Sequence, residues 1–310
     1  MHDPGMISPR VAVHIGYHKT ATTWLQREIL PRHPQIRSFV SGSPHASPLL
    51  QEIIGRSDRD FDAARARRAY EARLVELDVP ADGTVVISAE RLSGHAATGG
   101  YDTFGIARRL EAVLPEARVF FAVREQVAMI ESEYRQLVLE GCPSRIERLI
   151  DETSSWVDVG FDLGHYEYDR LADEYVRAFG DDRVAVFAFE SIREHPQVFL
   201  DRLATFLELE PWPPVPQGVL RSRVNPGLPG RLVGLRRFLN HFQRSPLNPD
   251  PLLALRPFWR SPLSALASRL PARRRPLLDD ATRQRLRDRY REPNRRLASR
   301  YGVSFPDACP

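Results

Sequence analysis

The chain contains almost no lysine. Of its 44 basic residues Lys19 is the only lysine, and the other 43 are arginines. An ammonium is compact and approaches a single oxygen end-on, whereas a guanidinium is planar and suits bidentate contacts. A sequence that uses arginine at every other basic position therefore indicates that position 19 needs the ammonium itself. The alternative is the chance survival of one lysine on a surface loop.

Cysteines and long apolar runs are also scarce. The two cysteines, Cys142 and Cys309, cannot form a disulfide framework, and neither has the spacing of zinc ligands. No apolar run approaches the roughly 20 residues that span a bilayer, and the N-terminus MHDPGMISPR lacks the pattern of a signal peptide. With 42% hydrophobic and 27% charged residues, the composition is that of an ordinary globular protein. We therefore expect a cytoplasmic protein without a structural metal or a transmembrane segment.

The net charge of +4 hides an asymmetry along the chain. Residues 221–300 hold 20 arginines against 5 acidic residues, a net charge of +15, and the remainder carries a net charge of −11. A basic C-terminal third favours an anionic partner, which could be an acidic substrate, a peripheral membrane surface or nucleic acid. Solvated arginine-rich helices are the other interpretation. Because the region contains no recognisable nucleic-acid-binding module, we do not expect a nucleic-acid partner.

Short apolar runs alternate with helical patterns over the first two thirds of the chain. The runs are nearly continuous and rich in β-branched and aromatic residues, which is typical of strands buried on both faces. They cover Val11–Gly16, Thr84–Ser88, Arg118–Val123 and Arg183–Phe189. Helices are predicted over Thr22–Leu30, Phe104–Val113, Gln126–Glu140, Tyr166–Phe179 and His195–Leu207. This alternation predicts an α/β fold, a three-layer parallel sheet flanked by helices, with the ligand beyond the carboxyl ends of the strands.

We expect a single domain over residues 1–310. Residues 10–210 form its α/β core. Residues 211–280 are punctuated by proline and predict a helical cap, with short pieces such as Arg231–Phe242. Residues 281–305 form a closing helix that packs back onto the core.

The turn between the first strand and the first helix reads GYHKTATT. Backbone amides at such a turn, together with the helix N-terminus, form a ready anion site. Lys19 adds a point charge there, and the hydroxyls of Thr20, Thr22 and Thr23 add donors. The spacing differs from a Walker A loop, because the lysine lies three residues after Gly16 and does not follow a second glycine. The turn predicts phosphate-binding chemistry.

The longer segment GYHKTATTWLQ resembles the 5′-phosphosulfate-binding loop of sulfotransferases that use 3′-phosphoadenosine 5′-phosphosulfate (PAPS), especially bacterial members with a GxxKTGTTxLQ pattern. The resemblance implies that the donor is bound by Gly16, His18, Lys19, Thr20, Ala21, Thr22, Thr23 and Trp24. Trp24 would lie against the adenine, and packing in the core is the alternative for this residue. Ala21 stands where the family has glycine, and an alanine there is strained if the backbone needs a positive φ.

A second segment, RVFFAVREQVAMIESEY, resembles the second signature of the same family. In that signature an arginine ends a strand and a serine follows eight residues later, which here are Arg124 and Ser132. The resemblance implies that both bind the 3′-phosphate of the donor; a strand-end salt bridge and a surface serine are the alternative. Gln126 stands where the family often has proline. The similarity covers roughly residues 10–210 and 281–305 and implies the P-loop NTPase-like sulfotransferase fold.

The implied reaction is transfer of a sulfuryl group from PAPS to an acceptor hydroxyl, which leaves 3′-phosphoadenosine 5′-phosphate (PAP) and needs no metal. An ammonium at the bridging oxygen would stabilise the growing negative charge, which gives Lys19 its role. Glu90, just after the run TVVIS, is the candidate base, and His18 and His95 are weaker ones. A glutamate paired with an arginine is the alternative for Glu90. Carbohydrate sulfotransferases use a glutamate in this place, so the expected acceptor is a glycan or another hydroxyl compound, and the basic region leaves an anionic one open.

Two other functions remain possible at this point. A P-loop kinase or NTPase would need Mg²⁺ and an acidic ligand for it, and none of the four predicted strands ends in Asp. A non-catalytic protein could bind an anionic polymer or a membrane through the basic region, but it would have no use for Lys19 and Glu90 together.

Overall fold

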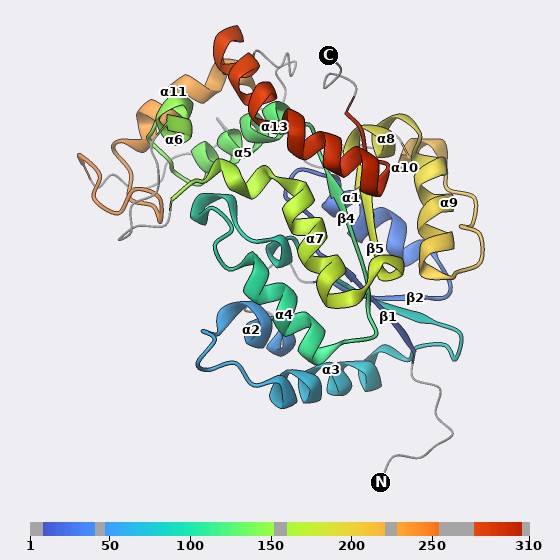
Figure 1. Ribbon diagram of the computed structural model, residues 1–310. Helices are drawn as coiled ribbons and strands as arrows, with labels where there is room; N and C mark the ends of the chain where they lie inside the picture. Colours follow the sequence, from blue (N-terminus) through green and yellow to red (C-terminus); the bar gives the residue numbers. More distant parts are fainter. Residues whose placement is uncertain (1–8, 41–46, 152–159, 221–227, 254–275, 306–310) are drawn as a thin grey trace.

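A computed structural model describes residues 9–40, 47–151, 160–220, 228–253 and 276–305 (Figure 1). The expectations for residues 221–227 and 254–275, which include much of the arginine-rich region, fall outside the described residues.

Five strands form one parallel sheet in the order β2-β3-β1-β4-β5. The strands are β1 (Arg10–His14), β2 (Ile36–Val40), β3 (Thr84–Ser88), β4 (Arg118–Val123) and β5 (Val184–Ala188). The predicted parallel α/β sheet is confirmed. In this order β1 lies between β3 and β4, so the loops that follow these three strands meet at one edge of the sheet, where α/β proteins bind their ligands.

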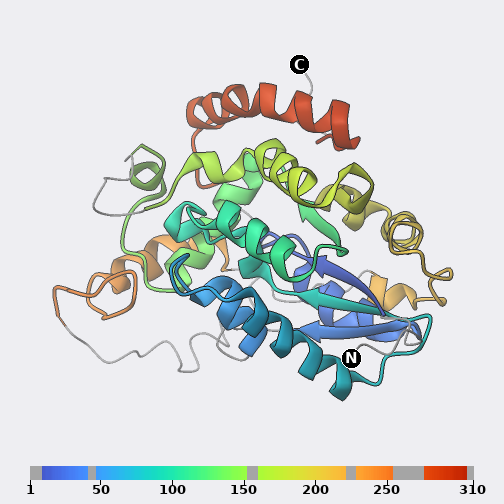
Figure 2. The same cartoon turned by 60° about the horizontal axis from the view of Figure 1, so that its bottom comes forward.

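Helices cover both faces of the sheet (Figures 1 and 2). Figure 2 shows α13 stacked on α7, which in turn lies over the sheet. The α-helices are α1 (Thr22–Trp24), α2 (Pro48–Gly55), α3 (Ala63–Leu77), α4 (Thr103–Val113), α5 (Gln126–Leu139), α6 (Ile146–Asp151), α7 (Tyr168–Phe179), α8 (Phe189–Glu194), α9 (Pro196–Leu207), α10 (Gln217–Leu220), α11 (Gly230–Asn240) and α13 (Asp280–Tyr301). After α1 the chain continues through a π-helical turn (Leu25–Ile29) and a 3₁₀ turn (Leu30–Arg32).

Alternate residues of the central strands enter two separate hydrophobic clusters. Val13, Val85 and Phe121 belong to the cluster packed under α4, α5 and α7, whereas Ala12 and Phe120 belong to the cluster packed under α9. Side chains along a strand point to opposite faces, so a strand covered on both sides is apolar over most of its length. This is why the apolar runs located β1, β3, β4 and β5 in the sequence.

Strand β2 was not predicted. Its sequence, IRSFV, places Arg37 and Ser38 between apolar residues. The strand lies at the edge of the sheet, where Ile36 is buried while Arg37 and Ser38 stay partly exposed. A half-exposed edge strand needs no continuous apolar run, and the sequence signal is correspondingly weak.

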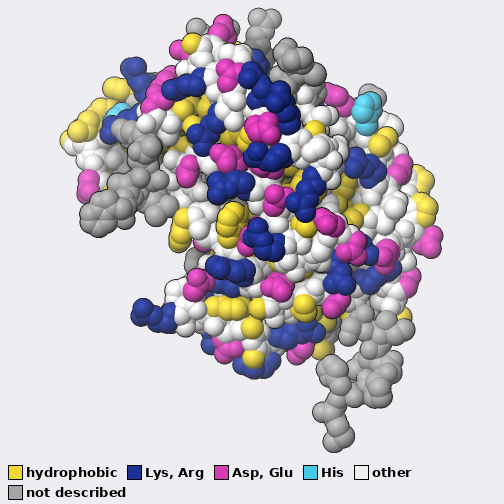
Figure 3. Space-filling view, in the orientation of Figure 1, with side chains coloured by type: hydrophobic (Ala, Val, Ile, Leu, Met, Phe, Trp, Pro, Cys, Tyr) yellow, Lys and Arg dark blue, Asp and Glu magenta, His cyan; other side chains and the backbone are white. Residues whose placement is uncertain are grey.

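The closing helix is present as α13, and most of the arginines on it are paired with acidic residues. Leu286, Tyr290 and Leu297 are buried beneath it. Figure 3 shows basic and acidic side chains intermingled over this face of the molecule. Pairs within 4 Å join Arg283 to Glu131, Arg285 to Asp151, Arg289 to Glu167, Arg296 to Asp169, and Arg300 to both Asp173 and Asp181. Within the described residues, these arginines fasten the helix to the body.

Gln126, at the place where the related pattern often has proline, also holds α13. Its side-chain amide donates to Oδ1 of Asn294 at 2.6 Å, and the amide of Asn294 donates back to Oε1 of Gln126 at 3.1 Å. Gln126 is buried. The departure from the pattern is thus explained by a reciprocal contact between α5 and α13.

The region expected to form a cap divides into two parts. Trp212 and Val215 are buried in the cluster under α9 and belong to the core. Helix α11 packs on α5 instead: the side-chain amide of Asn240 donates to the carbonyls of Val138 and Cys142 at 2.7 and 2.9 Å. The predicted helix Arg231–Phe242 is observed as Gly230–Asn240.

Candidate active site

The loop between β1 and α1 adopts a strained conformation. Lys19 and Ala21 both have positive φ, 63° and 67°, in the left-handed region. For L-residues this conformation costs about 1–2 kcal/mol each. Ala21 is therefore the strained alanine that its place in the glycine-containing pattern implied. Gly16 is required by close packing, because a Cβ there would lie 2.9 Å from the His14 ring and from Oγ1 of Thr22.

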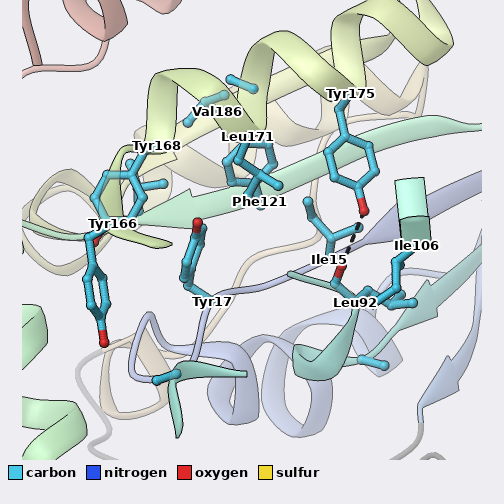
Figure 4. Close-up of a cluster of buried hydrophobic side chains, with 14 of the residues drawn as sticks. Ile15, Tyr17, Leu92, Ile106, Phe121, Tyr166, Tyr168, Leu171, Tyr175 and Val186 are labelled. Carbon is cyan, nitrogen blue, oxygen red and sulfur yellow. Dashed lines mark hydrogen bonds between the residues drawn. The ribbon is translucent and has the colours of Figure 1, made fainter. Parts of the chain in front are cut away.

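Tyr17 anchors the loop to the body of the protein. Figure 4 shows its ring beside buried tyrosines of α7 and of the 3₁₀ turn Leu163–Tyr166 that precedes it. Its hydroxyl donates to the carbonyl of His165 at 2.9 Å, and its ring meets that of Tyr168 edge-on. The hydroxyls of Thr20 and Thr22 both donate to the carbonyl of Tyr17, at 2.6 and 3.2 Å. The threonines predicted to bind an anion thus also brace the loop.

Lys19 reaches from the loop to α5. Its Nζ donates to Oε1 of Gln136 at 2.8 Å, and the amide of Gln136 donates to Oε1 of Glu140 at the same distance. Because that second bond fixes the orientation of the amide, an oxygen faces the ammonium. Ser132 lies one helical turn before Gln136, on the same face of α5. The structure therefore brings Lys19 against the helix face that carries Ser132.

Arg124 lies at the carboxyl end of β4, directly before α5. Its side chain is buried, and the guanidinium carbon lies 5.1 Å from the centre of the Phe189 ring. Its carbonyl accepts a hydrogen bond of 2.8 Å from the hydroxyl of the buried Tyr168. Glu190 accepts from the amide of Glu125 and holds the following residue. Ser132 is half-buried on the helix that begins two residues later.

Glu90 follows β3 and pairs with the loop. The distance from its Oε2 to Nδ1 of His18 is 2.8 Å. Ser93 is buried, and its hydroxyl is placed between the carbonyls of Gly16 and Glu90, at 3.2 and 3.0 Å. Glu90 is thus paired with a loop histidine rather than with an arginine, and it lies beside the predicted phosphosulfate loop.

The pKa values of His18 and Glu90 shift in complementary directions. Burial is the largest influence on His18 and favours the neutral ring, but the hydrogen bond to Glu90 and the charge of Glu133 outweigh it, and the pKa of His18 is raised. Burial favours the neutral form of Glu90 as well, yet its bond to His18 and the charge of Lys19 lower its pKa. Together the shifts favour an imidazolium–carboxylate pair at neutral pH.

Trp24 lies in the core rather than on an open surface. It is 6% exposed, packs against Phe199, and its indole N–H donates to the carbonyl of Val219 at 2.9 Å. A cavity of about 10 Å³ beside it is lined by Thr20, Ala21 and apolar residues, which is room for about one water molecule. This burial favours the core-packing alternative for Trp24 over a contact with adenine.

Two residues of the site were not identified from the sequence, Glu133 and Gln136. Both lie on α5, where Gln136 accepts a hydrogen bond from Lys19 and Glu133 is 5% exposed. Burial is the main reason that its pKa is raised. Together with Glu140 they occupy positions i, i+3 and i+7 of one helix face. A stripe of polar residues at this spacing after Arg124 is the pattern in the sequence that could have identified them.

The described residues include no group of three or more His, Cys, Asp or Glu placed to hold a metal ion. None of the described helices is both long and apolar enough to cross a membrane.

Comparisons with known proteins identify the family and the fold. The sequence matches the profile of the Sulfotransferase family over residues 12–214. The fold is similar to that of a sulfotransferase from Alicyclobacillus acidocaldarius, with a TM-score of 0.59 and 15% identity over 97% of this chain and 98% of that one. A sulfotransferase domain of the Synechococcus PCC 7002 olefin synthase matches with a TM-score of 0.46 and 14% identity over 98% and 99% of the chains. Mouse SULT7A1, in a structure described as complexed with PAP, matches with a TM-score of 0.36 and 12% identity over 93% and 85%.

No curated protein matches the chain. The family profile nevertheless covers well over half of the sequence, and it begins in β1 and ends after α9. The strand-end loop with its lysine, the arginine after β4 and the parallel sheet all lie within that range. The chain is a member of the sulfotransferase family.

Proposed function

We propose that the protein transfers a sulfuryl group from PAPS to an acceptor hydroxyl. The observation that carries this proposal is the contact of Lys19 with Gln136, one helical turn from Ser132 and on the helix that begins beside Arg124. Lys19 and Gln136 are 117 residues apart in the sequence, and Gln136 lies two residues beyond the second motif on the same helix. One nucleotide could then bridge the two motifs, with its sulfate end on the loop and its 3′-phosphate on Arg124 and Ser132.

The donor fits the chemistry of these residues. Lys19 and Ala21 have left-handed backbone, and turns that contain such residues can direct successive backbone N–H groups at an anion. Arg124 can fork onto a phosphate, and the hydroxyl of Ser132 can donate to the same group. Strain at two neighbouring loop positions is itself typical of functional sites.

In the proposed reaction Lys19 and Glu90 act on opposite sides of the sulfuryl group. Glu90 takes the proton as the acceptor hydroxyl attacks sulfur. The bond from sulfur to the bridging oxygen breaks, and the ammonium of Lys19 stabilises the negative charge that grows on the leaving phosphate of PAP. Sulfuryl transfer of this kind needs no metal.

The acceptor is proposed to be a glycan or another hydroxyl compound. In the described part of the site two acidic residues lie near Lys19, Glu133 on α5 and Glu140 at its C-cap. These acidic side chains disfavour an anionic acceptor. We also propose a cytoplasmic location, since the free, buried Cys142 is typical of a reducing compartment.

The test is incubation of the purified protein with sulfur-35-labelled PAPS and a panel of neutral and anionic hydroxyl acceptors. Formation of labelled product together with PAP would support the proposal. Metal-dependent hydrolysis of ATP without any use of PAPS would contradict it and favour a P-loop kinase or NTPase. Binding of anionic glycans without consumption of PAPS would favour a non-catalytic protein.

A further inference from the structure

His18 and Glu90 are held together by the fold. Their 2.8 Å contact joins the loop after β1 to the turn after β3, and both side chains are largely buried, at 26% and 32% exposed. The buried hydroxyl of Ser93 bridges the backbone on either side of this contact. Since hydrogen bonds from Ser93 hold the backbone next to both residues, the positions of β1 and β3 in the sheet determine the contact.

The charges that face His18 favour its protonated form. Five titratable groups face His18. They are Lys19 on the same loop, Glu90 after β3, Glu133 on α5, His95 before the 3₁₀ turn Ala96–Thr98, and His165 in the turn before α7. Burial, followed by the charge of His18, lowers the pKa of His95, and the same influences lower that of His165 to about 3. His95 and His165 therefore stay neutral, and two carboxylates oppose the single ammonium of Lys19.

A protonated His18 cannot itself act as a base. In the imidazolium both ring nitrogens carry hydrogen and neither has a free lone pair. Nδ1 is engaged with Glu90, and Nε2 is buried without a hydrogen-bond partner among the described residues. Glu90, by contrast, uses one carboxylate oxygen for His18 and keeps lone pairs on the other. The geometry thus assigns different roles to the two residues.

We propose that His18 is a positioning residue that holds the Glu90 carboxylate through Nδ1–H, so that the second carboxylate oxygen takes the proton of the acceptor hydroxyl. This inference rests on the proposed role of Glu90 as base. The acceptor O–H bond breaks as its oxygen bonds to sulfur, the proton goes to Glu90, and PAP leaves with the electron pair of the broken S–O bond. His18 keeps its own proton throughout.

The arrangement predicts a pH window for turnover. As the pH falls through the lowered pKa of Glu90, the base becomes protonated and the rate declines. As the pH rises through the raised pKa of His18, the imidazolium loses its charge and its hold on the carboxylate weakens. The alkaline limb of the rate profile should therefore belong to His18, although His18 is not the base.

Two substitutions separate positioning from a merely structural role. His18→Phe keeps a ring but removes the donor, and kcat should fall about 100-fold through misplacement of the carboxylate, while the KM for PAPS and the affinity for PAP change little. His18→Asn places an amide N–H near the position of Nδ1 but cannot titrate. Because the amide is a neutral donor, it should recover only part of the turnover, to about the level of the wild type above the pKa of His18, and it should lose the alkaline limb. His95→Asn, a matched change of a neighbouring histidine that caps its turn through the amide of Ala97, should keep that limb.

Wild-type kcat in His18→Phe, or an unchanged alkaline limb in His18→Asn, would overturn the inference even though the enzyme uses PAPS. If the wild type fails to use PAPS, or Glu90→Gln retains full turnover, the proposed function or its base fails, and the positioning role fails with it. A nuclear magnetic resonance titration tests the pair without any turnover. The pKa of His18 should lie above that of free histidine and fall in Glu90→Gln, and an equal pKa in both proteins would contradict the pairing.

Discussion

The substitution Lys19→Arg tests the significance of the single lysine, because it preserves the charge and changes only its shape. Nζ of Lys19 lies 2.8 Å from Oε1 of Gln136, and the amide of Gln136 is itself held by Glu140. The terminal nitrogens of a guanidinium lie about 1.3 Å beyond its central carbon. Arginine at this position would therefore have to displace Gln136 or fold back from the bridging oxygen of the donor.

The expected loss of turnover follows from this displacement of the positive charge. Removal of one transition-state donor typically costs about 10²–10³ in rate, or about 2.7–4 kcal/mol. We therefore expect kcat of Lys19→Arg to fall by about 10²–10³-fold. The affinity for PAP should change by less than about tenfold, since the positive charge stays in the loop.

The assay is steady-state turnover of PAPS, combined with calorimetric binding of PAP to each variant. Arg27→Lys makes the reverse exchange at an exposed position of the π-helical turn that follows α1 and should leave both quantities unchanged. If Lys19→Arg kept near-normal turnover, the role assigned to the ammonium would be refuted. An equal loss of turnover and of PAP affinity would show that Lys19 acts in binding only.

Three further predictions concern the loop, the base and the phosphate clamp. Ala21→Gly should stabilise the protein by about 0.5–1 kcal/mol in denaturant unfolding, because relief of the left-handed strain exceeds the entropic cost of glycine. The control Ala107→Gly, inside α4, should destabilise the protein by about 1 kcal/mol. A loss of stability in both variants would refute the strain at Ala21. Glu90→Gln should lower kcat by about 10²–10⁴-fold at unchanged PAP affinity, and normal turnover would exclude Glu90 as the base. Arg124→Lys should lower the affinity for PAP by about tenfold or more while the affinity for AMP stays the same. Equal losses of affinity for both nucleotides would argue against a contact with the 3′-phosphate.

The predictable part of the fold is the part buried on both faces. The runs Thr84–Ser88 and Arg118–Val123 match β3 and β4 residue for residue, because the interior positions of a central strand are buried on both faces and are apolar in both. Helix α3 was not predicted, since only Ala66 and Tyr70 are buried on it and its remaining residues carry little apolar periodicity. Edge and surface elements are specified by pairing and packing that a linear pattern does not contain.

The same division applies to the site. Lys19, Glu90 and Arg124 could be selected because each follows a predicted strand, and the carboxyl ends of parallel strands meet at one edge. The contacts of these residues could not be predicted, because the bond of Lys19 to Gln136 spans 117 positions and depends on how α5 packs. His18 was weighed as a weaker base candidate beside the loop, and its bond to Glu90 leads to the different role proposed above.

The most direct measurement of the central claim is a calorimetric titration of the wild-type protein with PAP and, separately, with AMP. The two nucleotides differ in the 3′-phosphate, the group assigned to Arg124 and Ser132. We predict that PAP binds far more tightly than AMP, with the preference lost in Arg124→Lys. Equal affinity for the two nucleotides, or no binding of PAP, would contradict a single donor site that spans the lysine loop and the arginine–serine pair.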